Sequence, residues 1–246
     1  MEGLCPPVFM SVPKTAVIIP AFNEEQSVGC VIRDLPKDMV RWVIVADNGS
    51  TDKTAEVARA SGAMVVSEPR RGYGNACLAG TANLPKEAEV VVFVDGDYSD
   101  YPGELRELLS VIQEQKVDMV IGSRVLGLCE KGSLKLQQRF GNWLSTRLIR
   151  WIYGFTYTDL GPFRAIRTDA LKRLNMQDSN YGWTVEMQVK ALQHGLRVVE
   201  VPVSYRRRIG KSKVSGTISG SVKAGAKIMW TIAKLAVASR ASKTEV

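Results

Sequence analysis

The residues with the clearest chemical potential are two aspartates separated by one glycine, Asp95 and Asp97, directly after an apolar run at 90–94. Hard divalent cations prefer oxygen ligands, and one or two carboxylates commonly hold Mg²⁺ or Mn²⁺ together with substrate phosphates. A solvated turn is the other interpretation of such a pair. The position after a buried run favours metal binding, so we expect Mg²⁺ or Mn²⁺ as cofactor.

Two further polar turns follow apolar runs in the same way. They read PAFNEE (20–25) and DNGSTDKT (47–54). Ser50 or Thr51 suits the cap of a helix that begins there, which leaves the Asp47 carboxylate available for a ligand. We expect Glu24 to project towards the same cleft.

These turns need elements that bring them together. Short apolar runs rich in β-branched residues alternate with stretches whose apolar residues recur at helical spacing. The predicted strands are 16–19, 42–46, 63–66, 90–94 and 118–121, and the predicted helices are 24–35, 51–60, 74–84 and 103–116. This pattern predicts a mostly parallel sheet with helices on both faces, in which ligands bind at the carboxyl ends of the strands.

The second half of the chain is less regular. The predicted elements are a helix over 134–155, a short strand over 163–167, a helix over 184–194, a strand over 197–203 and a basic amphipathic helix over 217–240. We find no repeat and no linker. The fold class is therefore α/β, as one domain with a C-terminal appendage.

The charge indicates anionic partners. The 246 residues carry a formal net charge of +8, and residues 205–246 hold ten Lys or Arg against a single glutamate. Nucleotide phosphates, phospholipid, a phosphorylated acceptor and nucleic acid all fit a basic protein. Carboxylates at three strand ends would repel a nucleic-acid backbone, so we expect no nucleic-acid partner.

The cellular compartment is predicted from features that the sequence does not contain. The four cysteines are scattered, which is typical of reduced thiols. No apolar run approaches the roughly 20 residues that span a bilayer. The N-terminus shows no basic segment followed by an apolar stretch, so we expect a cytoplasmic protein, peripheral at the inner face of a membrane.

The three polar turns, in this order, resemble the nucleotide-sugar-binding half of family 2 inverting glycosyltransferases. The resemblance continues through GSR (122–124), the segment 139–142, DLGPFRAIR (159–167), YGWTVEMQVKA (181–191) and RRRIGKSK (206–213). That order is similar to dolichol-phosphate mannose synthase and related polyprenyl-phosphate glycosyltransferases. It implies a GT-A fold, Rossmann-like, with a mostly parallel sheet.

The resemblance also implies a division of the chain. Residues 1–205 would form the GT-A catalytic domain, with a nucleotide-sugar half at about 14–124 and an acceptor half at about 125–205. Residues 206–246 would form a basic loop and an amphipathic C-terminal helix.

Roles for individual residues follow from the same resemblance. The donor-binding residues would be Pro20, Ala21, Phe22, Glu24, Asp47 and Gly96. The metal ligands would be Asp95, Asp97 and Ser99, and the phosphate- or acceptor-binding residues would be Arg139, Asp159, Arg207 and Lys213. The catalytic residues would be Asp95, Asp97, Arg124 and Glu186.

Some of these positions depart from the family pattern. Ser99 stands where the family often has a glutamine ligand, and Asp100 beside it is the alternative third ligand. Asn48 stands where the family commonly has a second aspartate. Glu186 lies on one predicted helix face with Lys190, so it either lines the acceptor site or forms a structural ion pair.

The implied reaction is transfer of a hexose from a nucleotide sugar, UDP-glucose or GDP-mannose, to an acceptor such as polyprenyl or dolichyl phosphate. A soluble hydroxyl or phosphate acceptor is the alternative, and a hydroxyl would need Asp159 or Glu186 as general base. A nucleotidyltransferase would also combine a parallel sheet with metal carboxylates. Its usual glycine-rich, basic first loop is replaced here by PAFNEE.

The C-terminal helix suggests a membrane partner. Its apolar residues share much of one side, and lysines lie near the flanks of that side. Such a helix suits the interface of an anionic bilayer. Packing of the same side on the catalytic domain or a second subunit is the alternative. The oligomeric state is not readable from the sequence.

Overall fold

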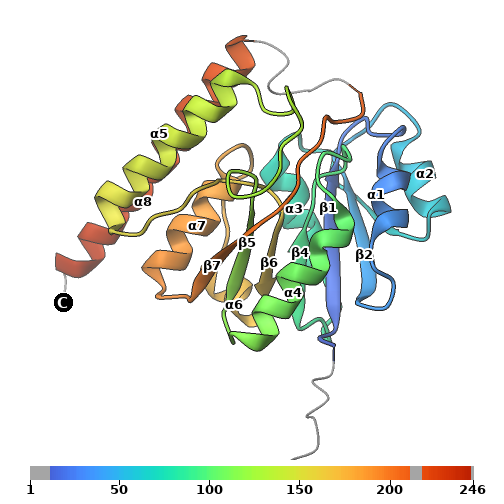
Figure 1. Cartoon of the computed structure of the whole chain (residues 1–246), viewed down its shortest axis with the longest axis horizontal. Helices are drawn as coiled ribbons and strands as arrows, with labels where there is room; N and C mark the ends of the chain where they lie inside the picture. Colours follow the sequence, from blue (N-terminus) through green and yellow to red (C-terminus); the bar gives the residue numbers. More distant parts are fainter. Residues whose placement is uncertain (1–11, 211–217, 245–246) are drawn as a thin grey trace, which may run out of the picture.

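The computed structural model describes residues 12–210 and 218–244 (Figure 1). The strands are β1 (Thr15–Ala21), β2 (Val40–Asp47), β3 (Met64–Ser67), β4 (Val90–Phe93), β5 (Met119–Ser123), β6 (Arg164–Arg167) and β7 (Val198–Pro202). The helices are α1 (Val28–Asp34), α2 (Thr54–Ala60), α3 (Tyr73–Ala82), α4 (Leu105–Glu114), α5 (Leu136–Tyr153), α6 (Thr168–Leu174), α7 (Trp183–Gln193) and α8 (Ile218–Thr244), with one 3₁₀ turn, η1 (Pro102–Glu104). Each predicted element is present, and α6 is an additional helix.

The strands of the described chain form one sheet in the order β3-β2-β1-β4-β6-β5-β7. β6 runs antiparallel to β4 and to β5, and the other neighbouring pairs are parallel. The predicted mostly parallel α/β sheet is therefore confirmed. Strands from both predicted halves contribute to this one sheet.

The side chains of β1 alternate between two cores. Val17 and Ile19 share a core with α1 and α4, whereas Ile18 shares the opposite core with α3 and α7. Every residue of β1 is buried, because helices cover both faces of the sheet. The strand consequently appears in the sequence as a continuous apolar run.

Helix α3 lies very close to β1. A Cβ atom on Gly80 would lie 2.5 Å from the Ile18 Cγ2 atom, so only glycine fits at this contact. α3 follows β3 and runs back across the sheet, and its first turn therefore lies at the carboxyl edge of the parallel strands.

Helices α5 and α8 lie side by side beyond α7 (Figure 1). Ile232 of α8 is fully buried, and Ile228 and Leu235 pack against the same core. The Met229 sulfur lies 3.9 Å from the Ser145 hydroxyl of α5. This side of the C-terminal helix packs within the protein, so the expectation that it faces a membrane is wrong for these residues. No helix in residues 12–210 or 218–244 is long and apolar enough to cross a bilayer.

Helix α8 should therefore contribute to folding. We expect Ile232→Ala to lower the free energy of unfolding by about 2–5 kcal/mol, because it leaves a cavity under the helix. Val237→Ala on the same helix should have little effect, since Val237 is 70% exposed. Urea unfolding followed by circular dichroism measures both, and equal losses in the two variants would contradict the packing role.

Candidate active site

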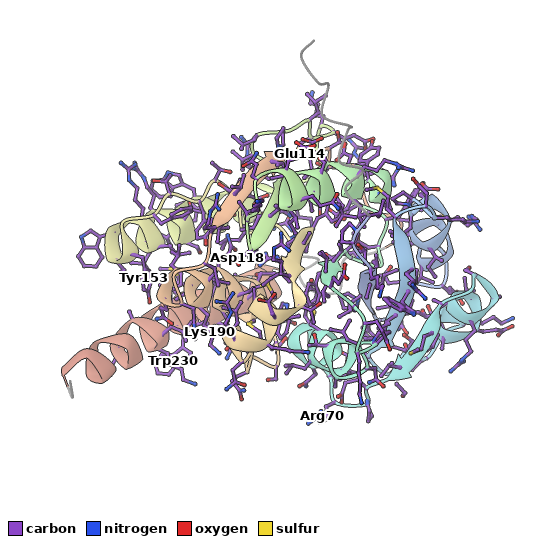
Figure 2. All side chains as sticks on the ribbon, turned by 90° about the horizontal axis from the view of Figure 1, so that it is seen from below. Arg70, Glu114, Asp118, Tyr153, Lys190 and Trp230 are labelled. Atoms are coloured by element: carbon purple, nitrogen blue, oxygen red, sulfur yellow. The ribbon has the colours of Figure 1, made fainter. Side chains whose placement is uncertain are left out.

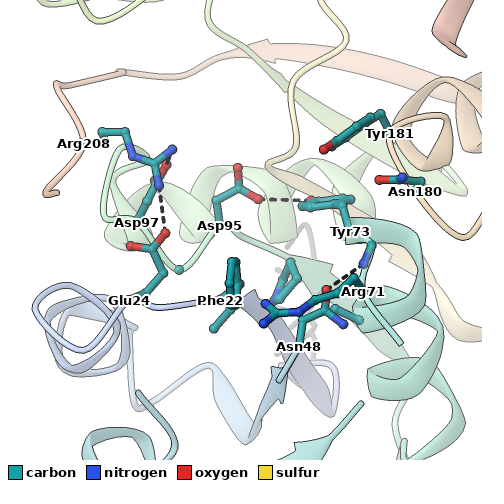
Figure 3. A pocket seen from close by; sticks show the side chains of 15 residues that line it. Phe22, Glu24, Asn48, Arg71, Tyr73, Asp95, Asp97, Asn180, Tyr181 and Arg208 are labelled. Carbon is teal, nitrogen blue, oxygen red and sulfur yellow. Dashed lines mark hydrogen bonds and ion pairs between the residues drawn. The ribbon is translucent and has the colours of Figure 1, made fainter. Parts of the chain in front are cut away.

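A cavity of about 290 Å³ opens at the carboxyl edge of the sheet (Figure 3). Pocket volumes near this size are typical of small-ligand sites. Seven residues predicted from the sequence line it, and they come from the ends of β1 and β4: Pro20, Ala21, Phe22, Glu24, Asp95, Gly96 and Asp97. The predicted donor loops and the aspartate pair therefore meet in one place.

Strand register explains this convergence. β1 pairs in parallel with both β2 and β4, so Ala21 lies opposite Asp47 and the residues after Phe93 follow at the same edge. The turns leave the sheet sharply, with positive φ angles at Asn23 (54°) and Tyr98 (62°). Such angles are uncommon for residues other than glycine and often occur at functional sites.

Asp95 lies against the first turn of α3. The Tyr73 hydroxyl donates a hydrogen bond of 3.1 Å to its Oδ1 atom (Figure 3). Burial, followed by the negative charge of Asp97, raises the pKa of Asp95 to about 7. A nearby cation would favour the ionised form of this carboxyl group.

Asp97 is held from two sides. Its Oδ1 atom accepts a hydrogen bond from the Ser99 amide at 2.9 Å and another from the Ser99 hydroxyl. Its Oδ2 atom lies 3.1 Å from Arg208, whose other terminal nitrogen lies 2.7 Å from Glu24 (Figure 3). The Arg208 guanidinium thus joins the turn after β1 to the turn after β4.

Asp100 is a third carboxyl group in the same turn. It is buried, and neither of its oxygens has a hydrogen-bond partner among the described residues. Burial, and then the charges of Asp95 and Asp97, raise its pKa well above the usual range. Asp95 and Asp97, together with the unpartnered oxygens of Asp100 in the same turn, offer oxygen ligands of the kind that a hard divalent cation prefers.

The carboxyl groups do not form a complete metal site. Within the described ranges, no group of three or more His, Cys, Asp or Glu side chains is arranged to hold a metal ion. This fits a cation that takes its remaining ligands from substrate phosphates. In this structure the Ser99 hydroxyl orients Asp97, and the unpartnered oxygens belong to Asp100.

Arg208 reaches the cavity because its segment lies along the turn after β4. The Arg206 amide donates to the Ser99 carbonyl at 2.9 Å, and the Ile209 amide donates to the Asp97 carbonyl at 3.0 Å. Arg206 and Arg208 both contact this turn, whereas the Arg207 guanidinium points away and donates to the Lys131 carbonyl. The sequence analysis selected Arg207, but the structure places Arg208 in the cavity.

Other cavity residues were not assigned to the site from the sequence. They are Asn48, Arg71, Gly72, Tyr73, Ala76, Asn180 and Tyr181. Several belong to the glycine-rich segment GYGNA (72–76), whose composition was a usable signal. A Cβ atom on Gly74 would lie 1.9 Å from the Asp178 carbonyl oxygen, so this glycine lets the 178–181 loop close against α3.

Arg71 covers the ring of Phe22. The guanidinium carbon lies 3.7 Å from the ring centroid, which is a cation–π contact at the mouth of the site. Arg71 and Arg208 are the two cationic side chains among the described residues that line the cavity, and the other charged residues there are carboxylates. Such groups suit a ligand that carries both an aromatic base and a diphosphate.

Arg124 and Asp159 form a largely buried pair, with side chains that are 14% and 1% exposed. The arginine Nε and Nη2 atoms donate to the two carboxylate oxygens at 2.7 and 2.8 Å, and the Arg124 amide donates at 2.9 Å. Burial alone would raise the pKa of Asp159, but the charge and hydrogen bonds of Arg124 outweigh it and hold that pKa below its usual range. Neither Arg124 nor Asp159 is among the described residues that line the cavity.

Glu186 also has a structural role. Its carboxylate accepts hydrogen bonds from the amides of Gln177 and Asp178, and it forms an ion pair of 2.8 Å with Lys190. The structural alternative predicted for Glu186 is therefore the one observed. Its effect on the cavity is indirect, since it anchors the start of the loop that carries Asn180 and Tyr181.

The remaining predicted residues lie elsewhere. Asp47 accepts a hydrogen bond from the Ser50 amide at 3.2 Å, and of the two neighbours it is Asn48 that lines the cavity. Arg139 is exposed on α5. Lys213 lies outside the described residues.

Comparison with known proteins agrees with this geometry. Residues 16–174 match the model of the family described as "Glycosyl transferase family 2". An uncharacterized glycosyltransferase of Mycobacterium tuberculosis is 38% identical over 209 residues, which are 84% of this chain and 92% of that protein. A dolichyl-phosphate hexose transferase of Haloferax volcanii is 33% identical over 209 residues, 84% of this chain and 89% of that protein.

A solved structure shows the same fold. Glucosyl-3-phosphoglycerate synthase from M. tuberculosis, crystallised with Mn²⁺, UDP and glucosyl-3-phosphoglycerate, aligns with a TM-score of 0.73. The alignment covers 91% of this chain and 80% of that one at 21% identity. The α/β sheet is therefore of the GT-A type, and the family match covers more than half of the sequence. The chain belongs to glycosyl transferase family 2.

Proposed function

We propose that the protein transfers a hexose from a nucleotide sugar to a polyprenyl phosphate, with inversion at the anomeric carbon. The observation that carries the proposal is the cavity in which Asp95 and Asp97 meet Arg208 beside the first turn of α3. The similarity to a dolichyl-phosphate hexose transferase over 84% of this chain supports the lipid acceptor. We place the reaction at the inner, cytoplasmic face of a membrane.

The donor would lie across the ends of β1 and β2. Phe22 and Arg71 offer stacking and charge, and Pro20, Ala21 and Gly96 offer backbone surface that a nucleoside could approach. Asn48, which lines the cavity, and its neighbour Asp47 would bind polar groups of the base or ribose. UDP-glucose and GDP-mannose remain the two candidate donors.

Mg²⁺ or Mn²⁺ would be held by Asp95 and Asp97, with Asp100 or Ser99 completing the protein ligands. When bound, such a cation neutralises negative charge that develops on the departing diphosphate. Arg208 would support the same charge from its position 3.1 Å from Asp97, because a guanidinium binds phosphate oxygens well.

In the reaction, an acceptor oxygen forms a bond to the anomeric carbon while the bond from that carbon to the diphosphate breaks. The electron pair of the broken bond stays with the nucleoside diphosphate. An acceptor phosphate is already an anion, so no residue has to remove a proton from it. This fits a site in which both carboxylates considered as general bases, Asp159 and Glu186, are held in other interactions.

A small phosphorylated acceptor is the second candidate. The observation that favours it is the structural neighbour, which was also crystallised with Mn²⁺, UDP-glucose and phosphoglyceric acid. If its phosphate were the acceptor, no residue would have to remove a proton. If its hydroxyl were the acceptor, a base would have to take the hydroxyl proton. Product analysis with both acceptors decides between them.

The function is tested by transfer assays with UDP-glucose and GDP-mannose, each with polyprenyl phosphate or phosphoglyceric acid. We expect a glycosyl-lipid product from one donor, loss of activity in EDTA and recovery with Mn²⁺ or Mg²⁺. Asp97→Asn should reduce transfer by on the order of 100-fold or more, because charge stabilisation is lost at the leaving group. Its fold should persist, since asparagine can still accept the Ser99 hydrogen bonds. Calorimetric titration with Mn²⁺ and nucleoside diphosphate should show weaker binding in the variant, and full activity in EDTA would reject the metal.

The neighbouring arginines provide a matched pair. We expect Arg208→Gln to lower transfer on the order of 100-fold, because it removes a cationic donor beside the leaving diphosphate. Arg207→Gln should have a much smaller effect, since that side chain is bonded to the Lys131 carbonyl outside the cavity. Steady-state kinetics on both variants decides the matter. A larger defect in Arg207→Gln would restore the original assignment of Arg207 to the acceptor phosphate.

The Arg124–Asp159 pair should act on stability. Asp159→Asn is expected to lower the free energy of unfolding by about 3–5 kcal/mol at neutral pH, since it leaves the Arg124 charge buried and unpaired. The folded pKa of Asp159 lies below the unfolded one, so its contribution is present above about pH 4 and disappears as the pH falls further. The difference between variant and parent should therefore shrink in acid.

The surface pair Arg106–Asp38 serves as control for that experiment. Both side chains are more than half exposed, so Asp38→Asn should change stability little. Chemical unfolding at several pH values measures all three proteins. An Asp159→Asn variant that is as stable as Asp38→Asn would show that the buried pair has no structural role.

A further inference from the structure

Helix α5 presents its largest apolar side chains to solvent. The residues concerned form the α5 stripe: Leu136, Phe140, Trp143, Leu144 and Trp151. Their spacing puts them on one side of the helix, as in a helix that faces a core. Here, however, Phe140 is 61% exposed and Trp151 is 83% exposed, while small residues such as Ser145 and Thr146 are buried.

Phe140 and Trp143 of the stripe lie next to each other. The rings of Phe140 and Trp143 lie 5.9 Å apart, and the Arg147 guanidinium lies 5.6 Å from the centre of the Trp143 ring. Single exposed apolar residues are normal, but a contiguous patch marks an interaction surface. The fold does not explain the patch, since α5 is attached through its other side, where Ile149 is fully buried.

The charge on the helix that carries the stripe is positive. α5 carries three arginines, Arg139, Arg147 and Arg150, and no aspartate or glutamate. All three are exposed. Exposed indole rings flanked by arginines, whose stems lie along apolar surface while the charge stays in water, suit the interface of an anionic bilayer.

The position of α5 relative to the cavity fits such a partner. α5 begins at the carboxyl edge of the sheet (Figure 1), and the loop before it holds Arg207 through the Lys131 carbonyl. The next residue, Arg208, lies in the cavity. A surface bound along α5 would therefore lie close to the segment that carries Arg208 into the cavity.

We propose that α5, rather than α8, docks the protein onto an anionic lipid bilayer, with the α5 stripe in the interface and the arginines at the headgroups. The inference rests on the proposed function in that a polyprenyl-phosphate acceptor is confined to a bilayer. Docking itself requires neither donor nor acceptor.

The test is co-sedimentation with vesicles of phosphatidylcholine, with and without phosphatidylglycerol. The parent should bind the anionic vesicles, and binding should fall as salt rises, because each basic residue near the surface contributes through a screened attraction. The double variant Phe140→Ser with Trp151→Ser should bind about tenfold more weakly, since it removes two interfacial aromatic rings. Arg150→Glu should weaken binding to anionic vesicles only.

Trp230→Ser is the matched control. Trp230 lies on α8 outside the stripe (Figure 2) and is 63% exposed. Its replacement by serine therefore removes a comparable indole from another surface. It should bind like the parent. Equal binding by the double variant and the parent would overturn the proposal, as would an equal loss in Trp230→Ser. A parent that ignores vesicles but forms dimers, which the double variant dissociates, would instead show that the stripe contacts a second copy.

Function and docking can fail separately. Transfer to a short-chain polyprenyl phosphate in solution should be the same for the parent and the double variant, because the stripe does not belong to the described lining of the cavity. Vesicle binding without transfer to any polyprenyl phosphate would reject the proposed function and leave the docking surface. Transfer without vesicle binding would reject the docking surface alone.

Discussion

The site depends on three carboxyl groups in one turn at the end of β4, of which Asp97 and Asp100 are buried and Asp95 is half-buried. Like charges at short range disfavour their simultaneous ionisation, and burial adds to this effect. The protein offsets part of the cost with the Tyr73 and Ser99 hydrogen bonds and with Arg208. The oxygens of Asp100 keep no partner within the described chain. A bound cation would offset the remaining negative charge of the carboxyl groups, and a diphosphate would supply further oxygen ligands to that cation. The site therefore suits a cation and a diphosphate bound together.

Arg208 connects this balance to the rest of the fold. It comes from a segment more than a hundred residues away, which hydrogen-bonds along the turn from Asp97 to Asp100. The same segment contacts the loop before α5 through Arg207. One short stretch of chain thus contacts both the cavity and the loop before α5.

The two helices of that outer layer divide their tasks. α8 buries Ile232 against the core, and its Lys227 forms an ion pair of 2.9 Å with Asp178 in the loop that leads to Asn180 and Tyr181. α5 is attached by its small residues and turns its aromatic residues outwards. Amphipathic patterning alone does not distinguish these two cases, because an apolar stripe looks the same whether a core or a bilayer receives it.

The sequence by itself determined the elements of the sheet, the meeting of PAFNEE with the aspartate pair at Asp95 and Asp97, and the family. These rest on local signals, since apolar runs and turn residues report strands and strand ends. Tertiary structure decided which side chains enter the site. It pairs Arg124 with Asp159, fixes Glu186 beneath a loop, and brings in Arg208 instead of Arg207. Those choices depend on which segments hydrogen-bond to each other across the fold. The sequence alone does not distinguish a charged residue that is solvated from one that is buried in an ion pair, because the residue type is the same in both cases.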